Sequence, residues 1–259
     1  MIRVIKIGGA LLDDPEQRRA LCNELARSAA RRPTVVVHGG GRRVSEMATR
    51  CGLSPRFAGG LRVTDAATLE IVLMVLAGSV NKSLVAALAA AGARAVGLTG
   101  GDGSVASAEL LAPAAGVDLG YVGQVRSVRT DLLERLLESG LLPVVAPLAL
   151  SPEGEWLNVN ADQMAAALAR ALKASSLVFL TDVHGVLDAD GTVVPRLKAS
   201  AALRMIETGQ VQGGMRPKLE ACGEALTGGV AEVLILPGRE AHRLTAGTRP
   251  AGCGTRLTL

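Results

Sequence analysis

The stretches Val4-Ile5-Lys6-Ile7-Gly8-Gly9 and Thr34-Val35-Val36-Val37-His38-Gly39-Gly40-Gly41 share one pattern, a short apolar strand that runs directly into glycines. Because glycine has no Cβ, the backbone after each strand can approach a ligand closely. Where such a strand turns into a helix, N–H groups and the positive end of the helix dipole point at an anion above the sheet edge. Lys6 adds a cation within the first strand. The two stretches therefore predict a paired cradle for phosphate or carboxylate oxygens.

Neither glycine cluster has the spacing of the two commonest nucleotide-binding loops. A Walker A loop needs G-x-x-x-x-G-K-[ST], and a dinucleotide fold needs G-x-G-x-x-G. Gly8-Gly9 and Gly39-Gly40-Gly41 match neither pattern. The sequence thus predicts that phosphate is handled in another way than in P-loop proteins.

Composition limits the class of protein. With 259 residues, 49% of them hydrophobic and 20% charged, the chain can bury a large core, as one α/β unit or as two closely packed lobes. Aromatic residues are only 2% of the chain, whereas proteins that bind single-stranded nucleic acid stack bases on aromatic rings. The net charge of +4 is small and the basic residues are scattered. We expect small anionic substrates and no nucleic acid.

The cysteines and the N-terminal stretch bear on the compartment. Four cysteines lie far apart without a C-x-x-C pair, which favours a reducing cytosol over a disulfide framework or a metal site. Arg3 and Lys6 interrupt the first apolar stretch, so no signal peptide is expected. The most apolar later run, Leu69 to Leu76, is too short to span a bilayer. The sequence predicts a cytoplasmic protein without a membrane partner.

Apolar strands and helical repeats alternate along the chain, which predicts a three-layer αβα sandwich around a mainly parallel open sheet. The expected strands are 4–7, 34–38, 93–98, 142–146, 177–181, 233–236 and 255–258. The expected helices are 15–31, 65–91 with a break near Gly78 and Asn81, 131–139, 161–172, 200–207 and 218–227. Residues 105–110 and 120–128 are typical of short hairpins. A boundary near Lys173 divides the chain into lobes of residues 1–173 and 174–259.

Six motifs in order resemble the amino-acid kinase superfamily, and within it the acetylglutamate kinases. They are Lys6-Ile7-Gly8-Gly9, His38-Gly39-Gly40-Gly41, Gly60-Leu61-Arg62-Val63-Thr64, Asn81-Lys82, Asn158-Val159-Asn160-Ala161-Asp162 and Gly213-Gly214-Met215-x-x-Lys218. The resemblance implies the amino-acid kinase fold. It also implies that ATP phosphorylates the side-chain carboxylate of N-acetyl-L-glutamate, in arginine biosynthesis.

This chemistry agrees with the residue types that the chain offers. A carboxylate nucleophile is already ionised at neutral pH, so the reaction needs alignment and neutralised charge rather than a general base. The resemblance implies that Lys6 and Lys218 flank the transferring phosphoryl group and that Asp162 holds both lysines in place. An acid between two cations stays ionised and offsets their repulsion.

The resemblance also assigns the two substrates. Gly40 and Gly41 would contact the amino-acid substrate without a Cβ in the way, Arg62 would hold its α-carboxylate as a two-pronged fork, and Asn158 would bind the same end or the acetamido group. Gly8 and Gly9 would contact the moving phosphate. The remaining ATP-binding residues implied by the resemblance are Thr181, Asp182, Val183, His184, Gly185, Val186, Gln210, Val211 and Gln212. Mg²⁺ would bridge the β and γ phosphates, with no protein cage of its own.

Several alternatives stay open at the level of sequence. Related kinases act on carrier-bound aminoadipate, glutamate, aspartate, carbamate or UMP, and a non-catalytic nucleotide- or amino-acid-binding module is a further alternative. His38 is interpreted as a hydrogen-bonded strut rather than a proton shuttle. Asn81-Lys82 is either functional or a simple helix kink. The run 69–76 is apolar on nearly every helical face, which together with the resemblance predicts a homodimer.

Overall fold

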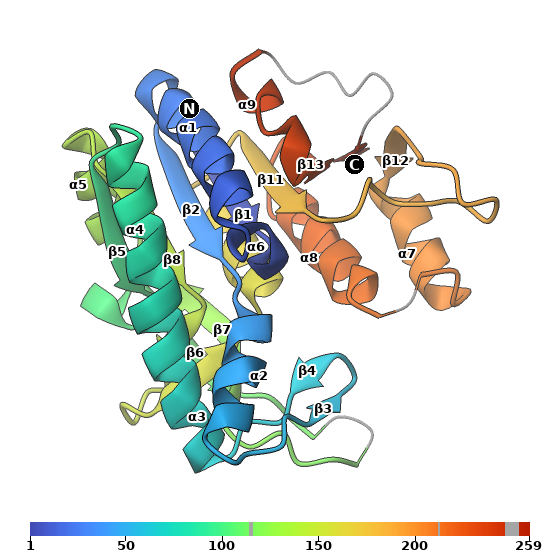
Figure 1. Ribbon diagram of the computed structural model, residues 1–259. Coiled ribbons are helices and arrows are strands. Elements are labelled where there is room, and N and C mark those ends of the chain that lie inside the picture. The colour runs from blue at the N-terminus through green and yellow to red at the C-terminus, as the bar shows by residue number, and fades with distance from the viewer. Residues whose placement is uncertain (114–115, 212, 247–253) are drawn as a thin grey trace.

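An eight-stranded sheet forms the middle layer of the computed structural model, which describes residues 1–113, 116–211, 213–246 and 254–259 (Figure 1). Its strands, in spatial order, are β12 (Arg196–Lys198), β14 (Thr255–Thr258), β13 (Glu232–Pro237), β11 (Ser176–Thr181), β1 (Arg3–Ile7), β2 (Thr34–His38), β8 (Leu142–Ala146) and β5 (Ala95–Thr99). The only antiparallel pair of neighbours among the described strands of this sheet is β13 with β14. The predicted fold class, a mainly parallel sheet between helices, is confirmed.

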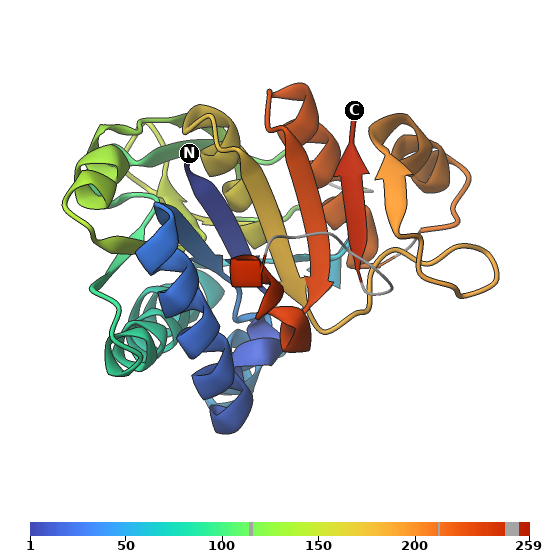
Figure 2. The ribbon, with the colours of Figure 1, turned by 90° about the horizontal axis from the view of Figure 1, so that it is seen from above.

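Helices cover both faces of this sheet, as Figure 2 shows. The described helices are α1 (Pro15–Arg31), α2 (Gly41–Arg50), α3 (Ala66–Val72), α4 (Asn81–Ala90), α5 (Asp131–Glu138), α6 (Ala161–Ala171), α7 (Ala199–Glu207), α8 (Met215–Thr227) and α9 (Arg243–Ala246). Short 3₁₀ turns are η1 (Gly9–Leu12), η3 (Asp102–Ser104) and η4 (Gly238–Glu240). The predicted bounds of α1 and β2 agree with the structure residue for residue, and α8 begins three positions before the predicted Lys218.

Alternation along the central strands divides the core into two parts. Ile5 and Ile7 of β1 belong to one cluster with side chains of α1, α3 and α4. Val4 belongs to the other, with side chains of α6, α7 and α8. Successive residues of a strand face opposite sides of the sheet, so Lys6 shares the face of Val4. That placement turns the one charged side chain in the interior of β1 toward α6 and α8.

A small closed barrel extends beyond the sheet. It consists of β10 (Trp156–Val159), β7 (Val122–Val128), β6 (Ala106–Leu110) and β9 (Leu148–Leu150). The antiparallel pairing of β6 with β7 agrees with the predicted hairpin. The strands β9 and β10 were not predicted, nor was the two-stranded ribbon of β3 (Phe57–Ala58) and β4 (Leu61–Arg62). All of them are short: β3 pairs with β4, and β9 with β10, as local antiparallel hairpins, and only the pairings of β10 with β7 and of β9 with β6 join distant parts of the chain.

The predicted break near Gly78 and Asn81 is wrong, because the helix there is continuous. An eight-residue π-helix, η2 (Leu73–Val80), joins α3 to α4 without a gap, so 25 residues from Ala66 to Ala90 form one helical segment. By length and composition, this is one helix in the described chain that could cross a membrane, so the argument that the apolar run is too short fails. Its inward side chains, among them Val75 and Leu84, pack in the core against the sheet.

Strand β1 lies between β2 and β11 in the sheet. β2 is the next strand in the sequence, whereas β11 comes much later, so the chain leaves β1 on one side and returns on the other. In open α/β sheets, ligands bind beyond the carboxyl ends of strands at such a switch point. The residues that follow these ends are Gly8-Gly9, Gly39-Gly40-Gly41 and Asp182. The fold therefore brings three separate predicted motifs to one edge of the sheet.

Candidate active site

The two glycine loops contact one another. A Cβ added to Gly9 would lie 2.8 Å from the backbone nitrogen of Gly40, a distance that real Cβ atoms do not show. The N–H of Gly39 donates to the carbonyl of Ile7 at 2.9 Å, which ties the second loop to the end of β1. In the described chain, the N–H groups of Gly9 and Gly40 donate to no protein acceptor. These two amides remain available to a bound anion.

Gly8, which the sequence predicts to contact the phosphate, already uses its amide within the sheet. Its N–H donates to the carbonyl of Leu180 at 2.8 Å and thereby continues the ladder between β1 and β11. The amide of Gly8 is therefore committed to the fold. Of the two glycines expected to contact phosphate, only Gly9 keeps a free amide among the described contacts.

Lys6, Asp162 and Lys218 meet in a buried cluster. The Nζ atom of Lys6 lies 2.8 Å from Oδ1 of Asp162, and Nζ of Lys218 donates to Oδ2 at 2.9 Å. The three residues are 6–9% exposed. One carboxylate thus bridges two ammonium groups that come from opposite ends of the chain.

Local structure fixes each member of this cluster. Asp162 lies in the first turn of α6, where the side chain of Asn160 caps the helix and accepts from the N–H of Asp162 at 2.8 Å. A carboxylate there also complements the positive end of the helix dipole. Lys218 lies in the first turn of α8, and its Nζ lies 5.0 Å from the centre of the Phe179 ring, which attracts the cation.

The charges of the cluster are strongly coupled. Burial raises the pKa of Asp162, but the ammonium groups of Lys6 and Lys218 outweigh it, so that the pKa lies below the usual value of a carboxyl group. Burial lowers the pKa of Lys6, which the carboxylate of Asp162 partly restores. An ionised aspartate with two ammonium groups carries a net charge of +1, which suits a phosphoryl group in transfer.

Arg62 and its neighbours form a second group beside the glycines. Nη2 of Arg62 donates to the carbonyl of Gly41 and to Oγ of Ser45, each at 2.7 Å, and the guanidinium lies 4.7 Å from the ring centre of Phe57. One arm of the predicted two-pronged fork is therefore used by the protein. Nη1 is buried and has no partner among the described residues. A carboxylate in the adjoining pocket would satisfy that arm.

Asn158 is connected to Arg62 through Thr64. Nδ2 of Asn158 donates to Oγ1 of Thr64 at 3.1 Å, and that hydroxyl donates to the carbonyl of Arg62 at 2.8 Å. Thr64 ends one of the quoted sequence motifs but was given no role there, and Ser45 was not singled out from the sequence. An isolated hydroxyl residue such as Ser45 carries no spacing pattern that would have found it.

These residues line a pocket of about 210 Å³ that contains all four positions predicted to bind the amino-acid substrate. Its polar or glycine members include Gly40, Gly41, Arg62 and Asn158, and Val72 and Leu76 give it an apolar wall. A Cβ on Gly41 would meet only Nη2 of Arg62, at 3.9 Å, so its Cα faces open space. The Cβ direction of Gly40 is instead filled by Leu76 and Val80.

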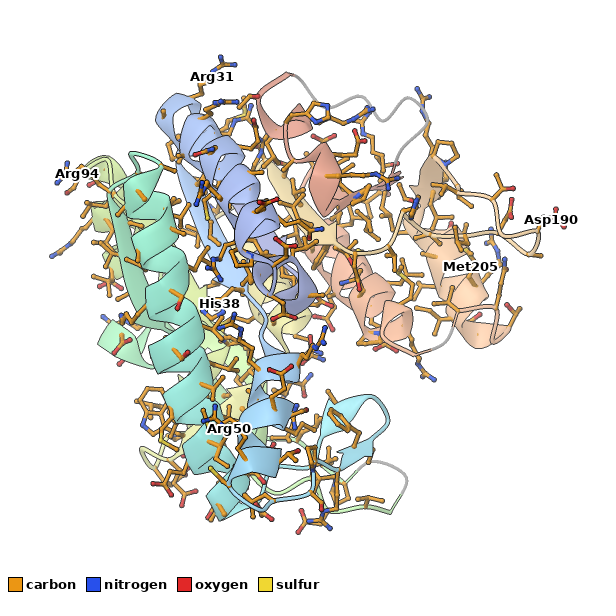
Figure 3. All side chains as sticks on the ribbon, viewed as in Figure 1. Arg31, His38, Arg50, Arg94, Asp190 and Met205 are labelled. Atoms are coloured by element: carbon orange, nitrogen blue, oxygen red, sulfur yellow. The ribbon has the colours of Figure 1, made fainter. Side chains whose placement is uncertain are left out.

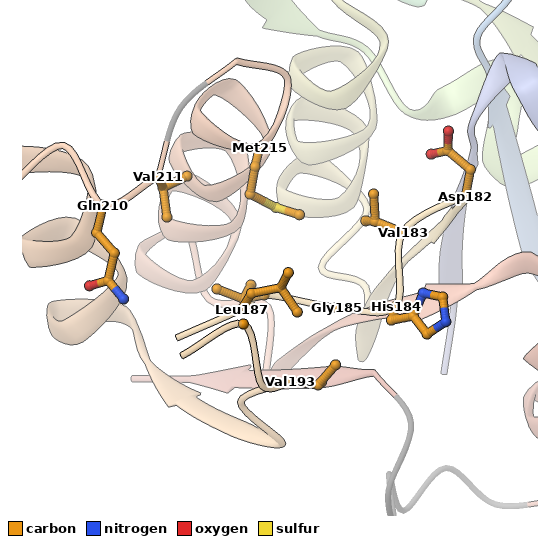
Figure 4. A pocket seen from close by; sticks show the side chains of 11 residues that line it. Asp182, Val183, His184, Gly185, Leu187, Val193, Gln210, Val211 and Met215 are labelled. Carbon is orange, nitrogen blue, oxygen red and sulfur yellow. The ribbon is translucent and has the colours of Figure 1, made fainter. Parts of the chain in front are cut away.

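A second pocket, of about 540 Å³, gathers most of the residues predicted to bind ATP (Figure 4). Asp182, Val183, His184, Gly185, Val186, Gln210 and Val211 line it; Thr181 lies in the neighbouring pocket beside α1, and Gln212 lies outside the described residues. Figure 4 shows Leu187 and Met215 facing one another across the cavity. Gly185, at φ 148°, leaves no room for a Cβ beside Thr255, so this glycine also has a packing role.

The charged cluster is close in the sequence to lining residues of both pockets. Ala161, next to Asp162, lines the smaller pocket, and Met215, one turn before Lys218, lines the larger one. Two pockets, each with a lining residue next to or one turn away from this cationic cluster, suit the direct transfer of an anionic group from one ligand to another.

His38 is buried at the end of β2, in the centre of the molecule (Figure 3). Its Nδ1 lies 3.0 Å from the carbonyl oxygen of Gly39, and its Nε2 lies 3.1 Å from Nδ2 of Asn81. Burial lowers its pKa to about 4, so that the ring is neutral at pH 7. Both nitrogens are engaged, which agrees with a strut rather than a proton shuttle.

The lowered pKa of His38 predicts a loss of stability in acid. The unfolded imidazole takes up a proton near pH 6.5 and the folded one only near pH 4, so its contribution is complete above pH 6.5 and is lost as the pH falls toward 4. At ~1.4 kcal/mol per unit, the loss is about 3 kcal/mol at about pH 4. Urea unfolding at several pH values measures it, with His38→Asn as the control that does not titrate. Equal losses in both proteins would contradict the prediction.

Comparison with known proteins decides the family. The model of the amino acid kinase family matches residues 1–237. Acetylglutamate kinases from Bradyrhizobium diazoefficiens and Sinorhizobium fredii are 46% and 44% identical over 250 residues, which cover 92% of this chain and 84% of each relative. The chain belongs to the acetylglutamate kinases of the amino acid kinase family. The family predicted from the sequence motifs is confirmed.

Solved structures of amino acid kinase relatives agree with this placement. The protein smu.665 from Streptococcus mutans UA159 has a TM-score of 0.83 at 30% identity and covers 99% of this chain and 98% of its own. An N-acetylglutamate synthase from Neisseria gonorrhoeae, solved with coenzyme A and N-acetyl-glutamate, has a TM-score of 0.84 at 29% identity, and this kinase covers 59% of it. Carbamate kinase from Giardia lamblia, at 16% identity and a TM-score of 0.70, shares the fold.

Proposed function

We propose that this kinase transfers the γ-phosphoryl group of ATP to the side-chain carboxylate of N-acetyl-L-glutamate, in arginine biosynthesis. Relatives named acetylglutamate kinase at 42–46% identity over 92% of the chain support this reaction. The single observation that carries the mechanism is the buried bridge from Lys6 through Asp162 to Lys218.

The residues have distinct roles in the proposed reaction. The free Nη1 of Arg62 would bind the α-carboxylate of the amino acid in the smaller pocket. The larger pocket would hold the nucleotide, and its exposed apolar side chains Val183 and Leu187 suit a flat base. Lys6 and Lys218 would then neutralise the charge that spreads over the phosphoryl oxygens in the transition state, with the amide of Gly9 as a further donor, while the amide of Gly40 would serve the amino-acid substrate.

Mg²⁺ would accompany the nucleotide and neutralise its phosphate charge. Among the described residues no group of three or more His, Cys, Asp or Glu side chains could hold a metal ion by itself. A hard ion that binds phosphate oxygens and keeps its waters needs no such group. In the proposed reaction, Mg²⁺ would therefore be held by the phosphate oxygens of ATP and by water.

The proposal also covers the roles of the two lobes, the oligomeric state and the compartment. Residues 1–173 would bind the amino acid and residues 174–259 the nucleotide. A cytoplasmic homodimer would form through the larger lobe, where Met74 on the long apolar helix is 54% exposed and β5 ends the sheet.

The test of the function is the ATP-dependent formation of hydroxamate from N-acetyl-L-glutamate in the presence of hydroxylamine. We expect turnover with N-acetyl-L-glutamate and little with aspartate, carbamate, UMP or an aminoadipate carrier, for which the release of ADP is measured because phosphorylated UMP forms no hydroxamate. If none of these acceptors, N-acetyl-L-glutamate included, is turned over, a non-catalytic binding module would be favoured instead.

Arg62→Gln tests the assignment of the smaller pocket. Loss of a charge-assisted hydrogen bond of ~1.5–3 kcal/mol should raise KM for N-acetyl-L-glutamate about 10- to 100-fold. KM for ATP should hardly change, because Arg62 lies in the other pocket. The matched control is Arg56→Gln, which removes an exposed cation six residues earlier. A selective rise in KM for ATP would contradict the assignment.

A further inference from the structure

We propose that His38 and Asn81 are positioning residues that aim the N–H of Gly40 at the substrate's reacting carboxylate. This inference rests on the proposed function of the smaller pocket. Neither side chain lines that pocket itself. Gly39, Gly40 and Gly41 are among its lining residues, whereas His38 and Asn81 are not. Their action would pass through one peptide group.

The first step is the side-chain amide of Asn81. Its Nδ2 lies 2.9 Å from the carbonyl oxygen of Val144 and 3.4 Å from that of Leu98. Backbone carbonyls only accept hydrogen bonds, so the atom that faces them must be the nitrogen of the amide. The same nitrogen lies 3.1 Å from Nε2 of His38. Because that nitrogen can only donate, Nε2 of His38 must accept.

The second step is the tautomer of His38. A neutral imidazole carries its proton on one nitrogen, and the partner of the other nitrogen decides which. With Nε2 accepting from Asn81, the proton lies on Nδ1, which faces the carbonyl oxygen of Gly39 at 3.0 Å. That carbonyl only accepts. Both ends of the relay therefore require the same tautomer, and the ring is neutral because burial keeps its pKa at about 4.

The third step is the peptide between Gly39 and Gly40. The described chain contains no cis peptide bonds, and in a trans peptide the C=O and the following N–H point in opposite directions. A carbonyl of Gly39 held by His38 therefore fixes the direction of the Gly40 N–H. That N–H has no protein acceptor in the described chain, and Gly40 lines the smaller pocket. Glycines rotate freely, so a donor here needs a support of this kind.

Neighbouring groups hold the relay in place. Asn81 is 1% exposed, at the junction of the π-helix with α4, and a Cβ on Gly97 would collide with its Oδ1. Leu76 and Val80 of the π-helix fill the space beside the Cα of Gly40. Asn81 is thus functional in this view, which decides between the two readings that the sequence left open.

Two substitutions of His38 distinguish the effect of losing the N–H at Nδ1 from the effect of losing the imidazole ring. His38→Asn places an amide N–H near the position of Nδ1, whereas His38→Gln places its amide near Nε2 and leaves the carbonyl of Gly39 without a donor. We expect kcat with N-acetyl-L-glutamate to fall roughly 10- to 100-fold in His38→Gln, and His38→Asn to restore most of that loss. KM for ATP should stay within about twofold in both, since the relay supports only the acceptor side.

The control is Leu25→Ala, a fully buried position on α1 that belongs to neither pocket. It lowers stability without touching the relay, so kcat of the folded protein should be unchanged. Equal losses of kcat in both His38 variants, or full activity in both, would overturn the proposal. If the wild type turns over N-acetyl-L-glutamate while the variants show either of these results, this inference fails and the proposed function stands.

Nitrogen NMR of the wild type gives a second measurement that needs no variant of His38. The chain has 3 histidines, so the ring nitrogens can be assigned by elimination. We expect the proton on Nδ1 of His38 at pH 7, and the backbone amide of Gly40 to shift when N-acetyl-L-glutamate binds. A proton on Nε2, or an unmoved Gly40 amide at saturating substrate, would overturn the proposal.

Discussion

We expect Lys218→Met to lower kcat for phosphoryl transfer on the order of 100- to 1000-fold, with a small change in the KM values. Methionine keeps most of the length of the side chain but removes the ammonium group that faces Asp162 at 2.9 Å. A preorganised donor that acts on developing charge contributes on the order of 3 kcal/mol to the transition state and little to the ground state. Initial rates of hydroxamate formation at saturating substrates measure the effect.

The matched control is Arg216→Met, on the same turn of α8. Arg216 pairs with Glu220 at 3.0 Å and its side chain is 61% exposed. The substitution therefore removes one positive charge, as Lys218→Met does, but outside the site. We expect its rate to stay within about twofold of the wild type, as for other exposed ion pairs. A Lys218→Met enzyme within tenfold of the wild type would refute the proposed role.

Asp162→Asn has the second large effect, because it leaves two buried ammonium groups without a compensating charge. We expect the free energy of unfolding to fall by about 3–5 kcal/mol, the usual result of removing one partner from a buried ionic group. Loss of the carboxylate also lowers the pKa of Lys6 further, since Asp162 is what raises it against burial. The alkaline limb of kcat/KM should therefore move to lower pH.

Denaturant unfolding and a pH profile of kcat/KM measure the two effects of Asp162→Asn. Asp131→Asn is the control, because Asp131 is an exposed acid that also lies in the first turn of a helix. Its profile should coincide with that of the wild type. An unmoved alkaline limb together with unchanged stability in Asp162→Asn would show that the bridge has no electrostatic role.

The parts of the fold that follow from local pattern were predicted well. The helix from Pro15 to Arg31 begins with a capping Asp14 and a proline, and these are start signals that do not depend on the rest of the protein. The π-helix at Leu73–Val80 was not predicted; its Leu76 and Val80 lie beside Gly40, a contact that no spacing pattern records. Strands β9 and β10 were missed because each has only three or four residues, too few for an alternating pattern to stand out.

The site was predictable to a different degree. Lys6, Asp162 and Lys218 were assigned through the resemblance, because nothing in their spacing alone places residues 6, 162 and 218 together. The free arm of Arg62 and the partners Ser45 and Thr64 needed the structure, since a guanidinium's five N–H groups can be divided among neighbours in many ways. The backbone of Gly8 was predicted to contact phosphate, and that its N–H is already used by the sheet could be seen only in the structure.

The π-helix limits which insertions and deletions the sequence of this protein can accept during evolution. Successive residues of an α-helix are separated by about 100° around its axis, so deleting one residue between Leu73 and Val80 would rotate Asn81 away from the end of β2. Insertions or deletions at the far end of the same helix, beyond Leu88, would leave that register intact. The segment before Asn81 should therefore be sensitive to changes of length as well as to loss of its buried side chains Leu76 and Val80.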